Sequence, residues 1–196
     1  MAKADPDASK RERNKSIKWV VTIFLATIAI SGIITLVSDE VMSRSGLAVA
    51  FVILLVIVLI GIIFDIIGMA VASADEKPFH SMAARKVPGA QESIRLLRNA
   101  GRVSSICNDV VGDICGVVAG AASATIALRL VQSFSFSWPN VVSLIMSALV
   151  AGLTVGGKAI GKFFAVNSCT QIVYFVGKLI HSLRNFPKLL CKTKKK

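Results

Sequence analysis

The sequence predicts an all-α, polytopic integral membrane protein with four transmembrane helices and additional cytoplasmic interfacial helices. Apolar residues make up 54% of the 196 residues, and the mean hydropathy is +0.70. This composition is too apolar for an ordinary soluble domain. Four apolar segments are near the roughly 20 residues that a helix needs to cross a bilayer. Most basic residues lie outside these segments, as expected if the segments are transmembrane.

The four spans are predicted at about residues 17–36, 47–73, 103–128 and 141–159. The first is not expected to be a cleavable signal sequence, because its apolar run is too long and no small-residue cleavage site follows. The spans divide the chain into three regions. These are a basic N-terminal segment (1–16), a transmembrane domain (17–162) that includes the loop 74–102, and a C-terminal segment (163–196).

The loop 74–102 and the C-terminal segment are both predicted to form short helices at the membrane surface. Pro78 and the pair Pro88-Gly89 divide the loop into two helices. The C-terminal segment is predicted to be an amphipathic interfacial helix followed by a Lys-rich tail. A fifth span is not expected, because the apolar part of this segment, Cys169 to Ile180, is too short to cross a bilayer.

The basic residues orient the predicted spans. Of the 23 Lys and Arg, only Arg44 and Arg129 lie in the connections on one side. The positive-inside rule therefore predicts a multi-pass protein of the plasma membrane with both termini and the loop 74–102 cytoplasmic. The net charge of +12 also suits contact between the cytoplasmic helices and anionic lipid. Nucleic acid is not expected as a partner, because the basic residues are divided among three segments and lack interleaved aromatic residues.

Acidic residues inside the predicted spans are candidates for a functional site. Asp65 is the one charged residue between Gly46 and Ala74, and Asp109 and Asp113 lie one turn apart in the third span. A carboxylate near the centre of a membrane helix costs roughly 2.5–3.5 kcal/mol, so it normally faces protein, water or a cation.

Each of these residues also has a purely structural interpretation. Asp65 can instead reach the interface and pair with an Arg of the loop. Asp109 and Asp113 can pair with Lys158 rather than bind a cation, and Lys158 can be a simple anchor at the cytoplasmic end of its span.

Four short motifs resemble the transmembrane domain of the CNNM/CorB family of magnesium transporters. Residues 64–73 resemble its F-S-G-x-E-T-A-L-x-S motif, and residues 88–97 resemble G-A-x-x-A-L-x-L-L. Residues 105–114 resemble L-I-G-N-N-x-x-N-I, and residues 157–165 resemble G-E-I-x-P-K-x-x-A. The order and the separations match, over about residues 47 to 190. Compared with this family, the chain is expected to have an extra N-terminal span and to lack the cytosolic CBS pair.

The resemblance implies a homodimeric transporter of Mg²⁺ and a set of ligands for that ion. Asp65, Asn108, Asp109 and Asp113 stand at or beside the polar motif positions, and oxygen ligands suit a hard divalent cation. Lys158 stands where the family has a glutamate. Two expectations follow: a divalent-cation transporter, or a transport-inactive interaction or regulatory protein in which Lys158 occupies the ion site.

The remaining small and reactive residues indicate packing rather than catalysis. Small residues recur every four positions at Gly112, Gly116, Gly120 and Ala124, and in the pairs Gly152/Gly156 and Gly157/Gly161. Such ladders predict close helix packing, within one protomer or in a homodimer. Gly156-Gly157 is also a candidate for local unwinding.

The four cysteines are predicted to be free thiols and the two histidines to be solvated. The sequence carries no motif typical of an enzyme.

Overall fold

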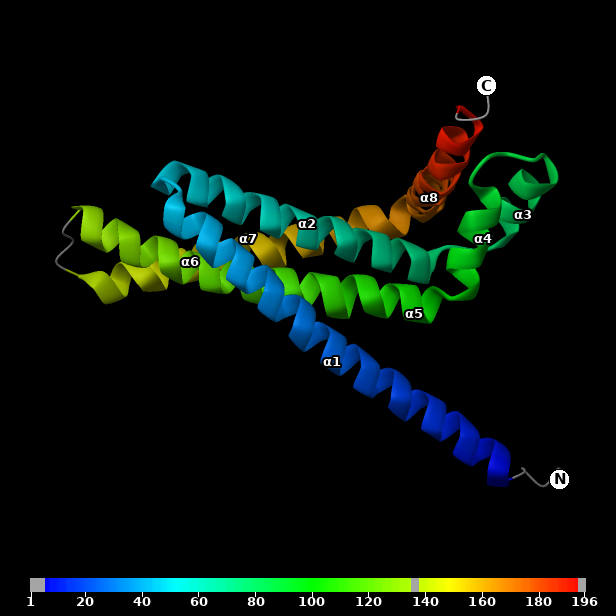
Figure 1. Ribbon diagram of the computed structural model, residues 1–196, viewed down its shortest axis with the longest axis horizontal. Coiled ribbons are helices and arrows are strands. Elements are labelled where there is room, and N and C mark those ends of the chain that lie inside the picture. The colour runs from blue at the N-terminus through cyan, green and yellow to red at the C-terminus, as the bar shows by residue number, and fades with distance from the viewer. Residues whose placement is uncertain (1–5, 135–137, 194–196) are drawn as a thin grey trace.

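The structure, a computed structural model, describes the backbone of residues 6–134 and 138–193 and the side chains of residues 17–42, 44–134 and 138–184. This part of the chain is helical, with no strand (Figure 1), which confirms the predicted all-α class for the described residues. The helical elements in chain order are α1 (Pro6–Arg44), α2 (Leu47–Ser73), α3 (Lys77–Ala84), α4 (Ala90–Arg98), α5 (Ala100–Ser105), the π-helical segment η1 (Ile106–Gly112), α6 (Asp113–Phe134), α7 (Pro139–Asn167) and α8 (Cys169–Thr193).

Four helical stretches among the described residues are long and apolar enough to cross a membrane. They are Ile17–Met42, Leu47–Ser73, Ala100–Phe134 and Pro139–Asn167. They coincide with the four predicted spans but extend beyond most of their predicted ends. The side chains of the predicted basic segment 1–16, of Cys191 and of the Lys-rich tail lie outside the described side chains.

The helix boundaries follow from proline, glycine and extended residues. α2 ends at Ser73 because Ala74 is extended (φ −81°, ψ 144°). Pro78 lies in the first turn of α3, where its missing N–H costs nothing. Gly89 has φ +91°, a conformation that favours glycine, and separates α3 from α4. The predicted division of the loop 74–102 into two short helices is therefore confirmed.

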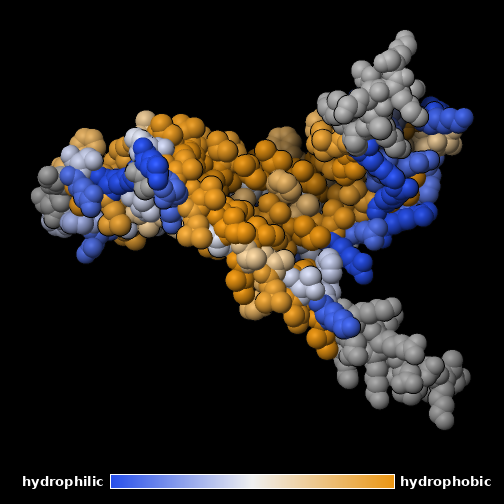
Figure 2. All heavy atoms as spheres, viewed as in Figure 1, coloured by the Kyte–Doolittle hydropathy of each residue, from blue (hydrophilic) through white to orange (hydrophobic). Residues whose placement is uncertain are grey.

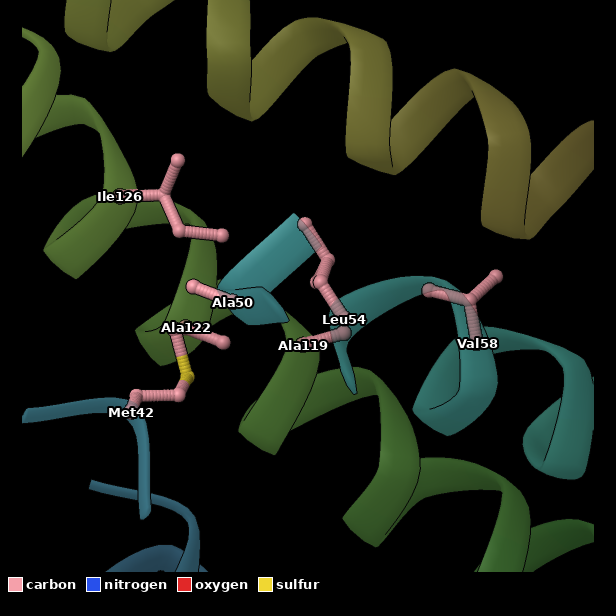
Figure 3. Close-up of a cluster of buried hydrophobic side chains, with 7 residues drawn as sticks. All are labelled: Met42, Ala50, Leu54, Val58, Ala119, Ala122 and Ile126. Atoms are coloured by element: carbon pink, nitrogen blue, oxygen red, sulfur yellow. The ribbon is translucent and has the colours of Figure 1, made fainter. Parts of the chain in front are cut away.

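The helices α2, α6 and α7 pack against one another, and α1 crosses α6 and then diverges from them (Figure 1). Seven side chains from α1, α2 and α6 form a buried cluster at the end where α1 meets α2 (Figure 3): Met42, Ala50, Leu54, Val58, Ala119, Ala122 and Ile126. A second buried cluster, which includes Phe79, Leu97 and Val173, joins α2 to α3, α4, α7 and α8. The first cluster closes one end of the bundle and the second closes the other.

The surface carries exposed apolar side chains along its middle and polar side chains towards its ends (Figure 2). Leu25 of α1, Val52 of α2 and Leu149 of α7 are among the exposed large apolar residues. A water-soluble monomer rarely exposes a continuous apolar surface of this extent. This surface is compatible with a membrane protein.

Two predicted details of the helices are wrong. Residues 163–167, expected to begin the interfacial helix, continue α7, and α8 begins at Cys169 after a break at Ser168. α7 also runs without interruption through Gly156-Gly157, where local unwinding was expected. The irregular helix is instead η1, in the third apolar stretch.

Only part of the small-residue ladder is used for packing among the described residues. A Cβ atom built on Gly157 or Gly161 would meet the side chains of Ile62 and Ile66, so α7 approaches α2 closely at these positions. By contrast, no heavy atom lies within 4 Å of a Cβ built on Gly116, Gly120, Gly152 or Gly156. Cys107, Cys115 and Cys169 are free thiols, as predicted.

Candidate functional site

The π-helical segment η1 lies in the third apolar stretch and carries three of the residues that bear on the predicted site. Asn108 and Asp109 belong to η1, and Asp113 begins α6 directly after it. A π-helical turn is wider than an α-helical turn and is frequent at functional sites. The wider turn changes the directions of neighbouring side chains relative to those of a regular α-helix.

Lys158 of α7 lies between two of the predicted ligands. Its Nζ atom is 3.8 Å from Oδ1 of Asp65 and 4.0 Å from Oδ1 of Asp113. Asp65 comes from α2, so the three residues, called the Lys158 cluster below, join three helices. The side chains of Lys158 and Asp65 are 27% and 17% exposed, whereas that of Asp113 is 73% exposed. Asp65 is therefore the more enclosed partner of the ammonium group.

Three glycines make room for this ion pair. Gly157 and Gly161 bring α7 close to α2, because they present no side chain to Ile62 and Ile66. A Cβ atom on Gly112 would lie 3.5 Å from Nζ of Lys158 and 3.9 Å from Oδ1 of Asp65. The bare surface of Gly112 therefore forms one wall of the space that the ammonium group occupies.

Asn108 faces α2 beside this cluster. Its Nδ2 donates to Oγ of Ser104 over 3.4 Å, and its Oδ1 is buried without a hydrogen-bond partner among the described residues. A Cβ atom on Gly68 would overlap Oδ1 of Asn108, so Gly68 is needed for this placement. A buried carbonyl oxygen without a donor is unfavourable and is uncommon in folded proteins.

Asp109 points elsewhere, into a groove beside α1. This groove, of about 390 Å³, is lined by Trp19, Val20, Ile23, Phe24, Thr27, Ser105, Asp109 and Val110. The guanidinium of Arg102 lies 5.2 Å from the ring centre of Trp19 at the same junction of α1 and α5. Asp109 is exposed and forms no ion pair with another described residue.

The four predicted ligands are therefore divided among three surroundings. Asp65 and Asp113 meet at Lys158, Asn108 faces Gly68, and Asp109 faces the groove beside α1. Among the described residues, no group of three or more His, Cys, Asp and Glu is arranged to hold a metal ion. The Oδ1 atom of Asn108 is a candidate oxygen ligand, because it is buried and has no hydrogen-bond donor among the described residues.

A second polar cluster, which sequence reasoning missed, joins α4 to α8. Nδ1 of His181 lies 3.3 Å from Oε1 of Glu92, and the buried Oγ of Ser93 donates to the carbonyl of Val173 over 3.2 Å. His181 was predicted to be solvated, but it contacts Glu92 of another helix. His80 is exposed, as predicted, and also contacts Glu76. A pairing across 80 residues leaves no local sequence pattern that would have revealed it.

Glu92 is ionised more readily than an ordinary glutamate. Burial raises the pKa of its carboxyl, but hydrogen bonds from its own backbone and from His181, together with the charges of His181 and Arg95, outweigh burial. The pKa of Glu92 therefore lies below its ordinary value of 4.5. The neighbours that favour the ionised carboxylate lie on both helices, Arg95 on α4 and His181 on α8.

Comparison of the chain with protein-family models, with curated proteins and with solved structures finds no match.

Proposed function

We propose that this protein is a transporter-like protein of the plasma membrane that does not carry ions and acts as an interaction or regulatory subunit. The observation that carries the proposal is the Lys158 ammonium between Asp65 and Asp113. A tethered cation at this point neutralises one carboxylate and repels a divalent ion that approaches the other. The chain's resemblance to the CNNM/CorB transmembrane domain supplies the transporter-like part of the proposal.

An interaction role is supported by Asp109. Its exposed carboxylate opens into the groove between α1 and η1. In a bilayer such a group is costly unless a cation neutralises it. A basic side chain on a helix of another membrane protein, or of a second copy, would remove that cost.

We expect Asp109→Asn to reduce the size of the assembly extracted from native membranes by mild detergent, as measured on a native gel. Asp65→Asn, which alters a carboxylate already paired within the chain, should leave that size unchanged.

Magnesium transport is the second candidate, and the buried Oδ1 of Asn108 is the specific observation that favours it. This oxygen lies beside Gly68, three residues after Asp65 on the same helix. Asp65 and Asn108 would then be the residues that contact the transported Mg²⁺, with Lys158 moving aside. Asp113 would be the second carboxylate near the ion, and Asp109 would stay outside the site.

Calorimetric titration of the purified protein with Mg²⁺ separates the two functions. We expect no saturable binding to the wild type, saturable binding to Lys158→Glu, and loss of that binding in Asp65→Ala/Lys158→Glu. Lys162→Glu is the matched control, because Lys162 lies one turn further along α7, is exposed and forms no ion pair with another described residue. It changes the net charge equally and should bind nothing.

The opposite result has an equally definite meaning. Saturable binding of Mg²⁺ to the wild type that disappears in Asp65→Ala would contradict the transport-inactive proposal. Flux of Mg²⁺ into vesicles containing a magnesium-sensitive dye would then establish transport.

A further inference from the structure

The cleft between α4 and α8 combines two arginines with an apolar wall. It measures about 260 Å³ and is lined by Glu92, Arg95, Leu96, Asn99, Val103, Ile180 and Arg184. Its lining comes from three elements, α4, α5 and α8, and from the residue that joins α4 to α5. It lies away from the Lys158 cluster and shares no residue with it.

The cleft carries a net positive charge, and its two guanidinium groups can bind a ligand. Neither guanidinium, of Arg95 or of Arg184, forms a hydrogen bond or an ion pair with a described side chain, although the charge of Arg95 is near enough to Glu92 to help lower the pKa of that carboxyl. The one carboxylate in the lining, Glu92, is in contact with His181. Guanidinium groups bind phosphate oxygens through paired, charge-assisted hydrogen bonds. The ligand that suits two such groups is therefore a phosphate.

The apolar wall indicates what else the ligand carries. Leu96, Val103 and Ile180 line the cleft beside the arginines. Val103 also lies near the beginning of the apolar stretch Ala100–Phe134. If this stretch crosses a bilayer, the cleft lies where the headgroups meet the hydrocarbon, with its charged groups on the polar side. A free phosphate has no part that would cover such a wall, whereas a phospholipid at this depth carries its acyl chains directly beside its phosphate.

We propose that this cleft binds an anionic phospholipid, with Arg95 and Arg184 holding its phosphate and Leu96, Val103 and Ile180 contacting the start of an acyl chain. Basic pockets beside membrane spans are a general means of binding anionic headgroups. The proposal goes beyond the proposed function. It depends on insertion into a bilayer, but it holds whether or not the protein transports ions. It also gives α8 a role: the bound lipid would bridge α8 to α4 and α5 at the membrane surface.

The test is retention of lipid by the purified protein, counted by native mass spectrometry after exposure to equal amounts of phosphatidylglycerol and phosphatidylcholine. We expect the wild type to prefer phosphatidylglycerol. Arg95→Gln/Arg184→Gln should lower its affinity for that lipid at least about tenfold, the effect of losing one charge-assisted hydrogen bond. The matched control is Arg85→Gln/Arg98→Gln, which removes the same charge from exposed residues outside the cleft and should leave the affinity within about twofold.

Three results would overturn the proposal. One is equal retention of the two lipids by the wild type. Another is an equal loss in both double variants, which would mean a general attraction of basic residues to the membrane. The third is full displacement of the lipid by soluble glycerol 3-phosphate, which would mean that the cleft binds phosphate alone.

Folding and insertion are measured separately from lipid binding. If Arg95→Gln/Arg184→Gln unfolds at a lower temperature than the wild type, the single variant Arg184→Gln is measured in its place. Because this side chain is exposed, the single variant should fold normally and should lower the affinity for phosphatidylglycerol less than the double variant does. An unchanged affinity in Arg184→Gln would reject the cleft.

Incorporation of the wild type into lipid nanodiscs, followed by size-exclusion chromatography, tests insertion itself. A protein that inserts but shows no lipid preference rejects the cleft and leaves the proposed function standing.

Discussion

At the scale of single residues, glycines decide which polar groups meet in the middle of the bundle. Gly157 lets α7 approach Ile62 of α2, Gly112 leaves room for the Lys158 ammonium, and Gly68 leaves room for the Asn108 amide. Each glycine faces a group on another helix. A side chain at any of these points would separate the helices or displace the polar group, so the arrangement of the site depends on the absence of Cβ atoms.

Gly68→Ala tests this dependence. The added Cβ would overlap Oδ1 of Asn108 and lie 3.0 Å from Cβ of Cys107. Because both neighbours belong to η1, which packs against α2, we expect a loss of about 1–3 kcal/mol in the free energy of unfolding, measured in detergent. The matched control is Gly120→Ala in α6, which meets no heavy atom within 4 Å. It should be neutral or stabilising by up to about 1 kcal/mol, because alanine favours a helix. Equal losses in both variants would contradict the close contact at Gly68.

A double-mutant cycle with Asp65→Asn and Lys158→Met measures the ion pair itself. We expect a coupling free energy on the order of 1 kcal/mol, since the charges are partly enclosed but 3.8 Å apart. The same cycle with Asp113→Asn should give a smaller value, because the Asp113 carboxylate is 73% exposed and can turn away. A larger coupling to Asp113 than to Asp65 would mean that the main partner of Lys158 is Asp113 of α6 and not Asp65 of α2.

The sequence left the pairing of Lys158 with Asp113 open as an alternative, but it did not predict the pairing of Lys158 with Asp65. Asp65 and Lys158 stand out because each is charged within an apolar stretch. Their contact depends on the glycines of α7 and on the wide turn at η1, which place side chains from three helices together. Asp109 and Asp113, one turn apart, were expected to act together. They have different surroundings because η1 ends between them.

At the scale of elements, the position of α8 depends on its contact with α4. A Cβ atom on Gly177 would overlap Oγ of Ser93 and lie 2.7 Å from the carbonyl oxygen of Gly89. We expect Gly177→Ala to separate α8 from α4 and to make α8 more sensitive to limited proteolysis. Gly101→Ala is the control, because a Cβ atom there meets nothing within 4 Å. Unchanged proteolysis of Gly177→Ala would mean that α8 does not rest on α4.

The same contact should weaken in acid. The folded-state pKa of Glu92 is lowered, so the stabilisation from its carboxylate is complete above about pH 4.5 and is lost as the pH falls through the lower folded value. Glu92→Gln should therefore unfold at a lower temperature than the wild type at pH 7, and the difference should shrink below pH 4.5. Glu76→Gln, in the exposed pair with His80, should have little effect at either pH. A difference that grows in acid would contradict the lowered pKa.

Element boundaries set by proline and by Gly89 were predictable, whereas the π-helical segment was not. Pro78 and Pro88 act locally, through missing donors and steric exclusion, so the sequence alone places α3 and α4. A wide turn within an apolar helix has no such local cause among residues 106–112. Gly156-Gly157 looked like a better place for unwinding, yet tight packing of Gly157 on Ile62 keeps α7 regular.

At the scale of the whole molecule, polar contacts differ between the two ends of the bundle. At the end where α1 meets α2, Arg129 donates to the carbonyl of Ser45 over 3.0 Å and Arg44 pairs with Glu40. The two basic residues of that end are therefore held by the protein itself. At the other end, α3, α4 and α8 carry exposed basic residues, and the beginning of α1 extends towards the same side (Figure 1). An uneven distribution of charge of this kind is what orients a protein in a membrane.

Labelling of single cysteines tests that orientation. In a variant whose four native cysteines are replaced by alanine, Gly46→Cys marks the connection between α1 and α2, and Ala84→Cys marks the end of α3. Both positions are exposed, and Gly46 meets no heavy atom within 4 Å. Between them, the 27 residues of α2 span about 40 Å, more than the roughly 30 Å of a bilayer's hydrocarbon core. If α2 crosses the membrane, the two positions must lie on opposite sides.

We expect a membrane-impermeant maleimide to label Gly46→Cys in intact cells and to label Ala84→Cys only after the cells are permeabilised. The reverse pattern would mean that the basic end faces outward, and the cleft between α4 and α8 would then meet the outer leaflet. Equal labelling of both positions in intact cells would mean that α2 does not cross. The apolar surface of α1, α2 and α7 would then have to be covered by protein instead of lipid, because a surface of that extent is not stable in water.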